Sequence, residues 1–304
     1  MPWLQFTFYS NKDRAEALAA RLEQANALAV SMLDAADQPL YEPPPGATPL
    51  WQLTNVLGLF AAEQDPEQLL ADLRAGWEGE FPDYRQEILE DQDWERVWMD
   101  DFHPMQFGQR LWIVPSWQGA PQQDGVNILL DPGLAFGTGT HPTTRLCLEW
   151  LDAHPPKGQR VIDYGCGSGI LAIAAALLGA DQLIAVDNDP QALLATRDNA
   201  QRNGVETRLL PYLPKECPDT PAALLIANIL AGPLITLAPR LAELVEQGGQ
   251  IVLSGILPEQ ADAVSAAYAP WFTMQPAVEH DGWIRLEGCK DLDNLAGSAT
   301  LSNT

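Results

Sequence analysis

A glycine-rich turn lies between an apolar strand and an apolar helix near the middle of the chain. Residues 161–163 carry the strand, the turn contains Gly165, Gly167 and Gly169, and residues 170–178 carry the helix. Glycines at such a strand-to-helix turn let the backbone approach a cofactor closely, and the following helix directs its N-terminus at that cofactor. The spacing predicts a nucleotide-type ligand against the backbone of this turn.

The turn alone does not choose the nucleotide. The segment that begins at Gly167 also fits the dinucleotide pattern G-x-G-x-x-G/A, which keeps an NAD-dependent dehydrogenase as an alternative. Asp163 lies just before the glycines, where a carboxylate would repel a pyrophosphate and attract the ammonium of a methionine moiety. S-adenosylmethionine carries that ammonium and no phosphate, so we favour it as the cofactor.

Asp187 closes the next apolar strand and is the candidate ribose ligand. An acidic side chain at this position can accept both hydroxyls of a ribose, in NAD enzymes as well, so Asp187 indicates adenosine without choosing the cofactor. Asp189 follows two residues later and precedes Pro190, a pattern typical of a helix cap. We therefore assign the ribose to Asp187.

Asn228 ends the apolar strand ALLIAN and is the candidate catalytic residue. In a doubly wound sheet the carboxyl ends of the strands face the binding crevice. The side-chain carbonyl of an Asn can accept a hydrogen bond from an amine and so aim the lone pair of that amine at an electrophilic methyl. The alternative is a turn Asn, but the apolar residues that follow favour a role in the crevice.

A Gly- and Thr-rich stretch, LLDPGLAFGTGTHPTT, precedes the first long helix of this region. We expect a lid over the cofactor, and Thr143 or Thr144 can cap the helix that follows. His141 could act as a general base, although a loop histidine before a proline is more often structural. The glycines that make the loop mobile or tightly turned are Gly133, Gly137 and Gly139.

The first part of the chain reads as a small α+β domain. Strands and helices follow in the order β-α-β-β-α-β, which fits a ferredoxin-like split unit, and we bound this domain at residues 1–85. Residues 86–125 are expected to be a linker with a helix whose tryptophans pack against a domain. The expected elements of the domain are a strand at 3–9, a helix at 12–24, strands at 29–34 and 55–61, and a helix that begins near Asp65.

Residues 126–290 read as an α/β domain. Short, continuous apolar runs alternate with helical segments, which predicts a doubly wound, mostly parallel sheet covered on both faces. The last two strands are joined through His280, Asp281 and Gly282 as an antiparallel hairpin, and residues 291–304 read as a disordered tail. The predicted strands are NILLD, RVIDYG, LIAVDND, ALLIAN and QIVLSGI.

Composition limits the compartment and the partners. The formal net charge of −24 repels nucleic acid and favours basic partners, although it also serves solubility. The N-terminus lacks an export signal and no apolar run is long enough for a bilayer span, so we expect a cytoplasmic protein without membrane contact. The scattered cysteines indicate neither a metal site nor a disulfide framework; they are Cys147, Cys166, Cys217 and Cys289.

Several segments, in order, carry a resemblance to a known family. FHPMQFG, DPGLAFGTGTHPTT, VIDYGCGSGILAIAA, DNDPQAL and ANILAGPL, after an MPW start, resemble the bacterial ribosomal protein L11 methyltransferase family. The resemblance runs from residue 1 to about residue 290. It implies a class I methyltransferase domain and a ferredoxin-like domain that docks ribosomal protein L11, whose lysine side chains and N-terminal amine would be trimethylated.

The resemblance also implies the site residues. Carried onto this sequence, the contacts to S-adenosylmethionine are Thr144 in the HPTT segment, Gly165 in the glycine turn, Asp187 on the ribose and Asn228 at the strand end. We expect Gly167 of the same turn to contact the cofactor as well. The Asn-Ile-Leu run departs from the Asn-Pro-Pro-Tyr signature of methyltransferases that act on planar amides or bases, which suits an sp³ amine. A non-catalytic, adenosine-sensing module that binds a ribosomal protein is a further alternative, and a monomer is the default oligomeric state.

Methyl transfer from a sulfonium is an in-line displacement and needs neither a metal nor a covalent residue. A lysine amine, with an ordinary pKa of about 10.4, must lose a proton before it attacks, which desolvation in a pocket favours. We expect the acidic surface to steer a basic substrate to the first domain and the transfer pocket itself to be locally apolar.

Overall fold

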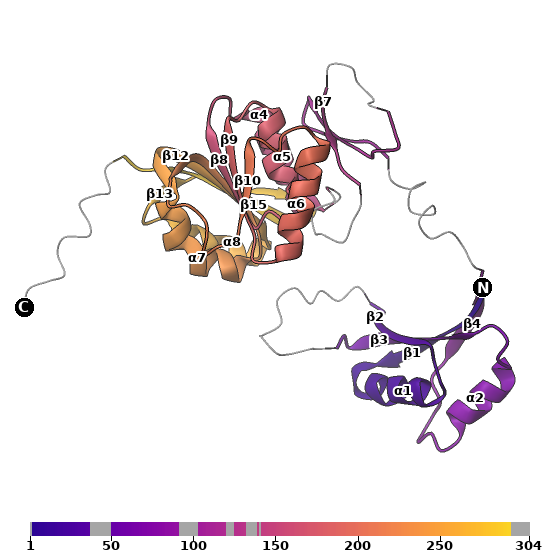
Figure 1. Cartoon of the computed structure of the whole chain (residues 1–304). Helices are drawn as coiled ribbons and strands as arrows, with labels where there is room; N and C mark the ends of the chain where they lie inside the picture. The colour runs from indigo at the N-terminus through magenta and orange to yellow at the C-terminus, as the bar shows by residue number, and fades with distance from the viewer. Residues whose placement is uncertain are drawn as a thin grey trace, which may run out of the picture. The chain divides into compact units, whose positions relative to one another are not determined.

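The computed structural model describes residues 2–36, 50–90, 103–119, 125–131, 139 and 141–292. The chain divides into two compact units, residues 1–101 and 102–304, and each is described by itself (Figure 1). Three predicted features lie outside the described residues: the helix of the linker, the lid around Gly133 and Gly137, and the tail beyond residue 292.

The first unit is an antiparallel sheet of four strands with two helices (Figure 1). The strands follow the order β2-β3-β1-β4, so β1 lies between β3 and β4 and is antiparallel to both. Along the chain the elements are β1 (Trp3–Asn11), α1 (Lys12–Gln24), β2 (Ala29–Asp34), β3 (Leu53–Ala61), α2 (Pro66–Arg74) and β4 (Tyr84–Leu89).

Helix α1 confirms the helix that apolar spacing predicted over residues 12–24. Asn11 caps its first turn, where the side-chain oxygen accepts a hydrogen bond from Asp13 N at 3.2 Å. Alternation along β1 turns Leu4, Phe6 and Phe8 toward the helices, so the core of the unit lies on one face of the sheet. The buried residues of α1 share one face at helical spacing; they are Ala15, Leu18, Ala19 and Leu22.

The second unit contains a mixed sheet in the order β10-β9-β8-β11-β12-β15-β13, with β14 paired to β15. The first five strands pair in parallel, and β15 is antiparallel to β12, β13 and β14. The strands are β8 (Arg160–Tyr164), β9 (Gln182–Val186), β10 (Leu209–Tyr212), β11 (Ala222–Asn228), β12 (Val245–Ile256), β13 (Phe272–Met274), β14 (Val278–His280) and β15 (Trp283–Lys290).

Helices cover both faces of this sheet, as the two-sided apolar strands predict (Figure 1). Val161 points into the cluster with α4, α5 and α6, and its neighbour Ile162 points into the cluster with α7 and α8. The helices are α4 (Pro142–Ala153), α5 (Ile170–Leu177), α6 (Pro190–Arg202), α7 (Ala231–Glu243) and α8 (Ala261–Tyr268), with a short 3₁₀ turn at Pro258–Gln260. No helix in the described ranges is both long and apolar enough to span a membrane.

A separate sheet of three strands shows that the sheet predicted for the NILLD strand was wrong. The run NILLD was expected to belong to the large parallel sheet, but its strand β7 (Val126–Leu129) pairs in parallel with β6 (Leu111–Val114), which pairs antiparallel with β5 (Met105–Phe107). Hydrophobic periodicity identifies a buried strand without naming its partner, and β6 supplies the apolar partner here. The two strands β5 and β6 lie within the residues that we expected to form a linker.

Candidate functional site

The carboxyl ends of three neighbouring strands build the candidate site. Strands β9, β8 and β11 are adjacent, and their last residues are followed by Asp187, by the glycine turn and by Ile229. The turn is attached to β9, because Gly165 N and Cys166 N both donate to Val186 O, at 2.7 and 3.0 Å. The glycine turn after β8 and Asp187 after β9, both predicted as functional, therefore lie together at the carboxyl ends of the parallel strands.

The conformation of the turn requires glycine. Gly165 has a φ of 84°, and a Cβ added there would lie 2.1 Å from Ile229 Cγ2. Gly169 has a φ of 79° and occupies the N-cap of α5, where an added Cβ would lie 2.9 Å from Thr196 Cγ2. The backbone of the turn thus lies closer to its neighbours than a residue with a side chain would allow. Because the N-cap of α5 is a glycine, no cap side chain covers the N-terminus of that helix.

Asp187 already organises the turn from the neighbouring strand. Its Oδ2 accepts a hydrogen bond from Gly167 N at 2.9 Å, and its Oδ1 accepts one from Asp189 N at 3.0 Å. Each carboxylate oxygen has a second lone pair, so both remain able to accept hydroxyls of a ligand. Asp189 caps α6 by accepting from Gln191 N at 2.9 Å, which confirms the helix-cap interpretation of that residue.

Asp163 is a buried carboxyl with one oxygen unsatisfied. The residue is 1% exposed; its Oδ2 accepts a hydrogen bond from Ala172 N at 3.0 Å, whereas its Oδ1 has no hydrogen-bond partner among the described residues. Burial raises the pKa of Asp163 to about 7, the Ala172 N–H opposes this rise, and the nearby Asp187 adds to it. A buried acceptor of this kind fits an ammonium group, which would stabilise its charged form.

Asn228 is oriented by the helix on the neighbouring face. Its Nδ2 donates to Thr144 Oγ1 at 3.4 Å, and Thr144 itself is buried near the start of α4. Because the amide nitrogen is used by Thr144, the carbonyl oxygen is the atom of Asn228 that can accept an N–H from a substrate. The hydrogen bond brings together two residues that the sequence places far apart.

His141 has a structural part in this arrangement. It occupies the N-cap of α4, where its Nδ1 accepts from Thr143 N at 3.3 Å and lies 2.7 Å from Thr143 Oγ1. The expectation that Thr143 or Thr144 caps this helix is therefore wrong, because the helix starts at Pro142, two residues before the start that a Thr143 cap would give. Burial lowers the pKa of His141, which keeps the imidazole neutral near pH 7.

Sequence analysis assigned no role to Trp283, the first residue of β15. Its ring packs edge-to-face on His141 with ring centroids 4.8 Å apart, so it lies beside the start of α4. The signal that could have found it is an aromatic residue at the first position of a strand that follows a tight turn, on the edge where the ligand was expected.

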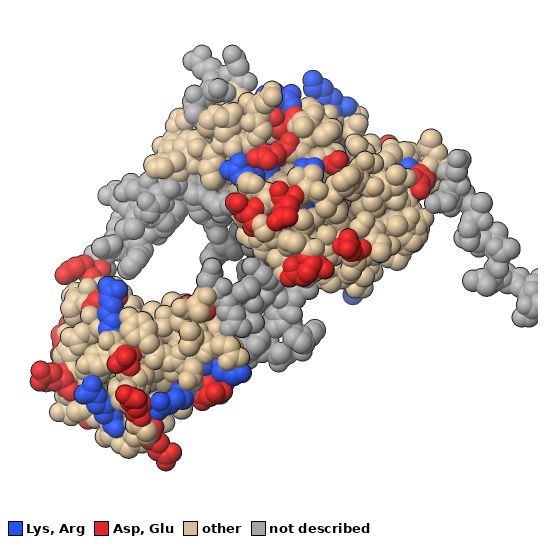
Figure 2. Space-filling model, turned by 180° about the vertical axis from the view of Figure 1, so that it is seen from behind, with Lys and Arg blue, Asp and Glu red and all other residues tan. Residues whose placement is uncertain are grey.

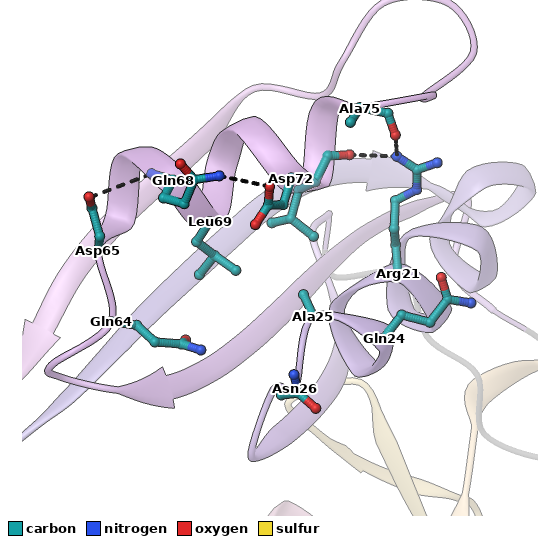
Figure 3. Close-up of a pocket in the computed structure, with 11 residues that line it drawn as sticks. Arg21, Gln24, Ala25, Asn26, Gln64, Asp65, Gln68, Leu69, Asp72 and Ala75 are labelled. Atoms are coloured by element: carbon teal, nitrogen blue, oxygen red, sulfur yellow. Dashed lines mark hydrogen bonds between the residues drawn. The ribbon is translucent and has the colours of Figure 1, made fainter.

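A hollow of about 460 Å³ lies elsewhere, in the first unit, between α1, α2 and the loop before α2 (Figure 3). Arg21 of α1 holds the two helices together by donating to Leu73 O and Ala75 O, each at 2.7 Å, and within α2 Gln68 donates to Asp72 at 2.9 Å. We assign no cofactor to this hollow. Within the described ranges, no group of three His, Cys, Asp or Glu residues is arranged to hold a metal ion.

Comparison with known proteins identifies the family. A family model described as ribosomal protein L11 methyltransferase matches residues 2–291. A protein of that name from Marinobacter nauticus is 60% identical over 293 residues, which cover 95% of this chain and 98% of that protein. Another from Ectopseudomonas mendocina is 56% identical over 291 residues, or 95% of this chain and 100% of that protein.

A solved structure agrees with the sequence comparisons. The crystal structure of ribosomal protein L11 methylase from Lactobacillus delbrueckii subsp. bulgaricus matches with a TM-score of 0.57 and 34% identity, over 62% of this chain and 100% of that chain. The mixed sheet with helices on both faces is thus an α/β methyltransferase fold. By sequence and by fold, the chain belongs to the ribosomal protein L11 methyltransferase family.

Proposed function

We propose that this protein transfers methyl groups from S-adenosylmethionine to amines of ribosomal protein L11, namely lysine side chains and the N-terminal amine. The observation that carries the proposal is the meeting of Asn228, Thr144, the glycine turn and Asp187 at one sheet edge. The names of the relatives support the choice of L11 as the acceptor.

The residues at this edge fit S-adenosylmethionine. Gly165 and Gly167 would lie against it with their backbone, Asp187 would accept the ribose hydroxyls, and Thr144 and Asn228 would complete the contacts. The unpartnered Oδ1 of Asp163 supports the choice, because it offers a buried acceptor to the ammonium of the methionine moiety. When bound, S-adenosylmethionine supplies an electrophilic methyl whose bond to sulfur breaks, with the electron pair left on sulfur, as the amine forms the new C–N bond.

Asn228 has the catalytic role in this proposal. Its carbonyl oxygen would accept one N–H of the neutral amine and so point the nitrogen lone pair at the methyl group. Ile229 and Leu230 follow it in the chain and would make the acceptor side apolar, where desolvation favours the neutral amine over the ammonium. No negative group is needed to activate the nucleophile.

We further propose that the first unit is a ferredoxin-like domain that recognises the substrate and that the second unit carries the transfer site. Strand β4 extends this domain beyond the boundary expected at residue 85, and β5 and β6 assign part of the expected linker, residues 86–125, to the second unit. The βαββαβ order and the strand order β2-β3-β1-β4 support a ferredoxin-like interpretation. A ribosomal protein as acceptor supports action in the cytoplasm.

Calorimetry with three ligands separates this proposal from its alternatives. S-adenosylmethionine and S-adenosylhomocysteine are expected to bind, NADH is expected not to bind, and addition of L11 with tritiated S-adenosylmethionine is expected to label L11. Tight binding of NADH would instead favour the dehydrogenase. Binding of S-adenosylmethionine without any labelling of L11 would favour the adenosine-sensing module.

A further inference from the structure

Trp283 lies at the same sheet edge as the catalytic asparagine. Strand β15 runs antiparallel to β12, so its first residue is at the edge where the parallel strands end. The ladder places Ile284 beside Ile256 and Ser254 beside Asn228, and Ser254 Oγ donates to Ile284 O at 3.1 Å. Backbone pairing alone therefore brings the start of β15 to the end of β11.

A second route through side chains leads to the same place. Asn228 donates to Thr144, Thr144 lies in the first turn of α4, and His141 at the cap of that helix packs on the indole of Trp283. The edge-to-face contact fixes the orientation of the indole, which is only half-buried and so keeps part of its surface accessible.

We propose that Trp283 forms an aromatic wall of the methyl-acceptor pocket and stabilises the positive charge that forms on the acceptor nitrogen in each transfer, so that one amine can receive several methyl groups. This inference rests on the proposed function of the site and assigns it a specificity-determining residue. The face of the Trp283 ring would contact the methyl groups carried by the acceptor nitrogen.

Successive methylation changes what a pocket can hold. A neutral lysine amine offers two N–H donors, a monomethylated amine offers one and a dimethylated amine none, so the hydrogen bond to Asn228 is no longer available for the third transfer. The attraction between a cation and an aromatic face does not depend on N–H groups, and it tolerates added methyls. Trp283, beside the start of α4, has the aromatic surface that the later steps require.

The charges around Trp283 are compatible with a cationic guest. His141, in ring contact with Trp283, is kept neutral by burial, which lowers its pKa. Arg285 lies two residues further along β15, where Leu146 O and Glu287 Oε2 each accept from its guanidinium at 3.3 Å. Glu287 offsets that positive charge through an ion pair with Arg285.

The test compares stepwise methylation by the full-length protein and by Trp283→Leu, Trp283→Phe and Trp271→Leu. Trp271 is a half-buried tryptophan that precedes β13, the last strand in the order of the sheet, and so controls for loss of an indole away from the site. With L11 and S-adenosylmethionine, mass spectrometry is expected to find mono- and dimethylated amines accumulating with Trp283→Leu, the third transfer slowed about tenfold relative to the first. Trp283→Phe should be intermediate, and Trp271→Leu should match the unaltered protein.

Equal slowing of all three transfers by Trp283→Leu, or an unchanged product distribution, would overturn the inference. Cofactor affinity measured for each variant separates a folding defect from a pocket defect, and Trp283→Phe retains an aromatic ring if the leucine variant does not fold.

A binding measurement tests the aromatic wall independently of methyl transfer. If L11 is not methylated, the proposed function fails, but the binding result still decides whether Trp283 contacts a methylated cation. The probes are a short peptide with trimethyllysine and the same peptide with its neutral tert-butyl analogue, added to the protein with S-adenosylhomocysteine. Preference for the cation that Trp283→Leu abolishes supports the aromatic wall, and equal binding of both probes contradicts it.

Discussion

Asp163 links the protonation state of a buried side chain to ligand binding. Burial raises its pKa to about 7, whereas the proposed ammonium contact requires the charged carboxylate. In the free protein the carboxylate is charged above pH 7, and below that value a bound proton must leave before the cofactor binds. Affinity for S-adenosylmethionine should therefore fall as pH decreases from about 7 to about 5.5, approaching tenfold per pH unit.

Calorimetry across this pH range checks the prediction, with Asp163→Asn as the control variant. The variant should bind the cofactor more weakly and with little dependence on pH. The same carboxyl should act on stability in the ligand-free protein: the folded state binds a proton that the unfolded state, with a pKa of 3.8, has already released. Stability should then decrease as pH rises from about 4 to about 7, and Asp163→Asn should remove that decrease.

Asn228 and Thr144 give a second prediction at the scale of single residues. Asn228→Ala removes the acceptor that aims the amine and should lower kcat about 10²-fold or more, because placement of the reacting groups is the main task of the site. Thr144→Val removes the partner of the Asn228 amide and a proposed cofactor contact, so the carbonyl loses its fixed orientation, kcat should fall by less, and cofactor affinity should fall as well.

Steady-state rates with L11 and calorimetric cofactor affinities separate the two effects. An Asn228→Ala variant with unaltered kcat would refute the catalytic assignment. A loss confined to cofactor affinity would leave Asn228 as a cofactor contact alone.

Sequence patterns were most informative where a residue type has a single physical use. The glycines at the turn and the acid at the end of β9 were identified because few other residues fit those positions. The contact of Thr144 with Asn228 and that of His141 with Trp283 join residues distant in sequence, so no local pattern could predict them. Both Thr144 and Asn228 were named through resemblance or strand position, and Trp283 was missed.

The glycine turn allows a test at the scale of an element. Gly165 and Gly204 both have positive φ values, 84° and 65°, but an added Cβ would meet Ile229 at the first position and open space at the second. Gly204→Ala therefore measures the backbone cost alone, about 1 kcal/mol. Gly165→Ala should lower Tm by more than Gly204→Ala does and should also abolish cofactor binding, because the turn must move away from Ile229.

Thermal unfolding and calorimetry of the two variants check the comparison. If Gly165→Ala matched Gly204→Ala in Tm and retained full cofactor affinity, the close packing of the turn on Ile229 would have no functional meaning.

Elements with strong periodicity and a clear cap could be predicted, and those defined by their partners could not. Helix α1 has the bounds that its spacing indicated, because Asn11 and one apolar face mark it locally. Strand β7 was assigned to the wrong sheet, since its partner β6 is fixed by packing. Strand β10 was missed: it is four residues long, contains Pro211 and lies at the edge of the sheet, where proline is tolerated.

At the scale of the whole molecule, charge is the feature to test. The formal net charge is −24, and Figure 2 shows acidic side chains spread over both units on the face seen there, with basic ones between them. We expect this field to accelerate association with a basic substrate, so the association rate with L11 should fall about tenfold or more as salt is raised from 50 to 500 mM.

Stopped-flow association kinetics measure this effect, and the affinity for S-adenosylmethionine over the same salt range is the internal control. The cofactor affinity should change little, because the proposed carboxylate contact to its ammonium, Asp163, is buried and therefore weakly screened. An association rate with L11 that does not depend on salt would show that the acidic surface serves solubility only.

The assignment of L11 as the methyl acceptor is tested by the intact mass of purified L11 after incubation with this protein and S-adenosylmethionine, beside the Asp187→Ala variant. Asp187 holds the turn through Gly167 and would hold the ribose, so the variant should lose both functions. We predict mass gains in steps of one methyl group, located on lysines and the N-terminal amine, that vanish with the variant. An unchanged mass of L11, with cofactor binding intact, would contradict the assignment of L11 as the substrate.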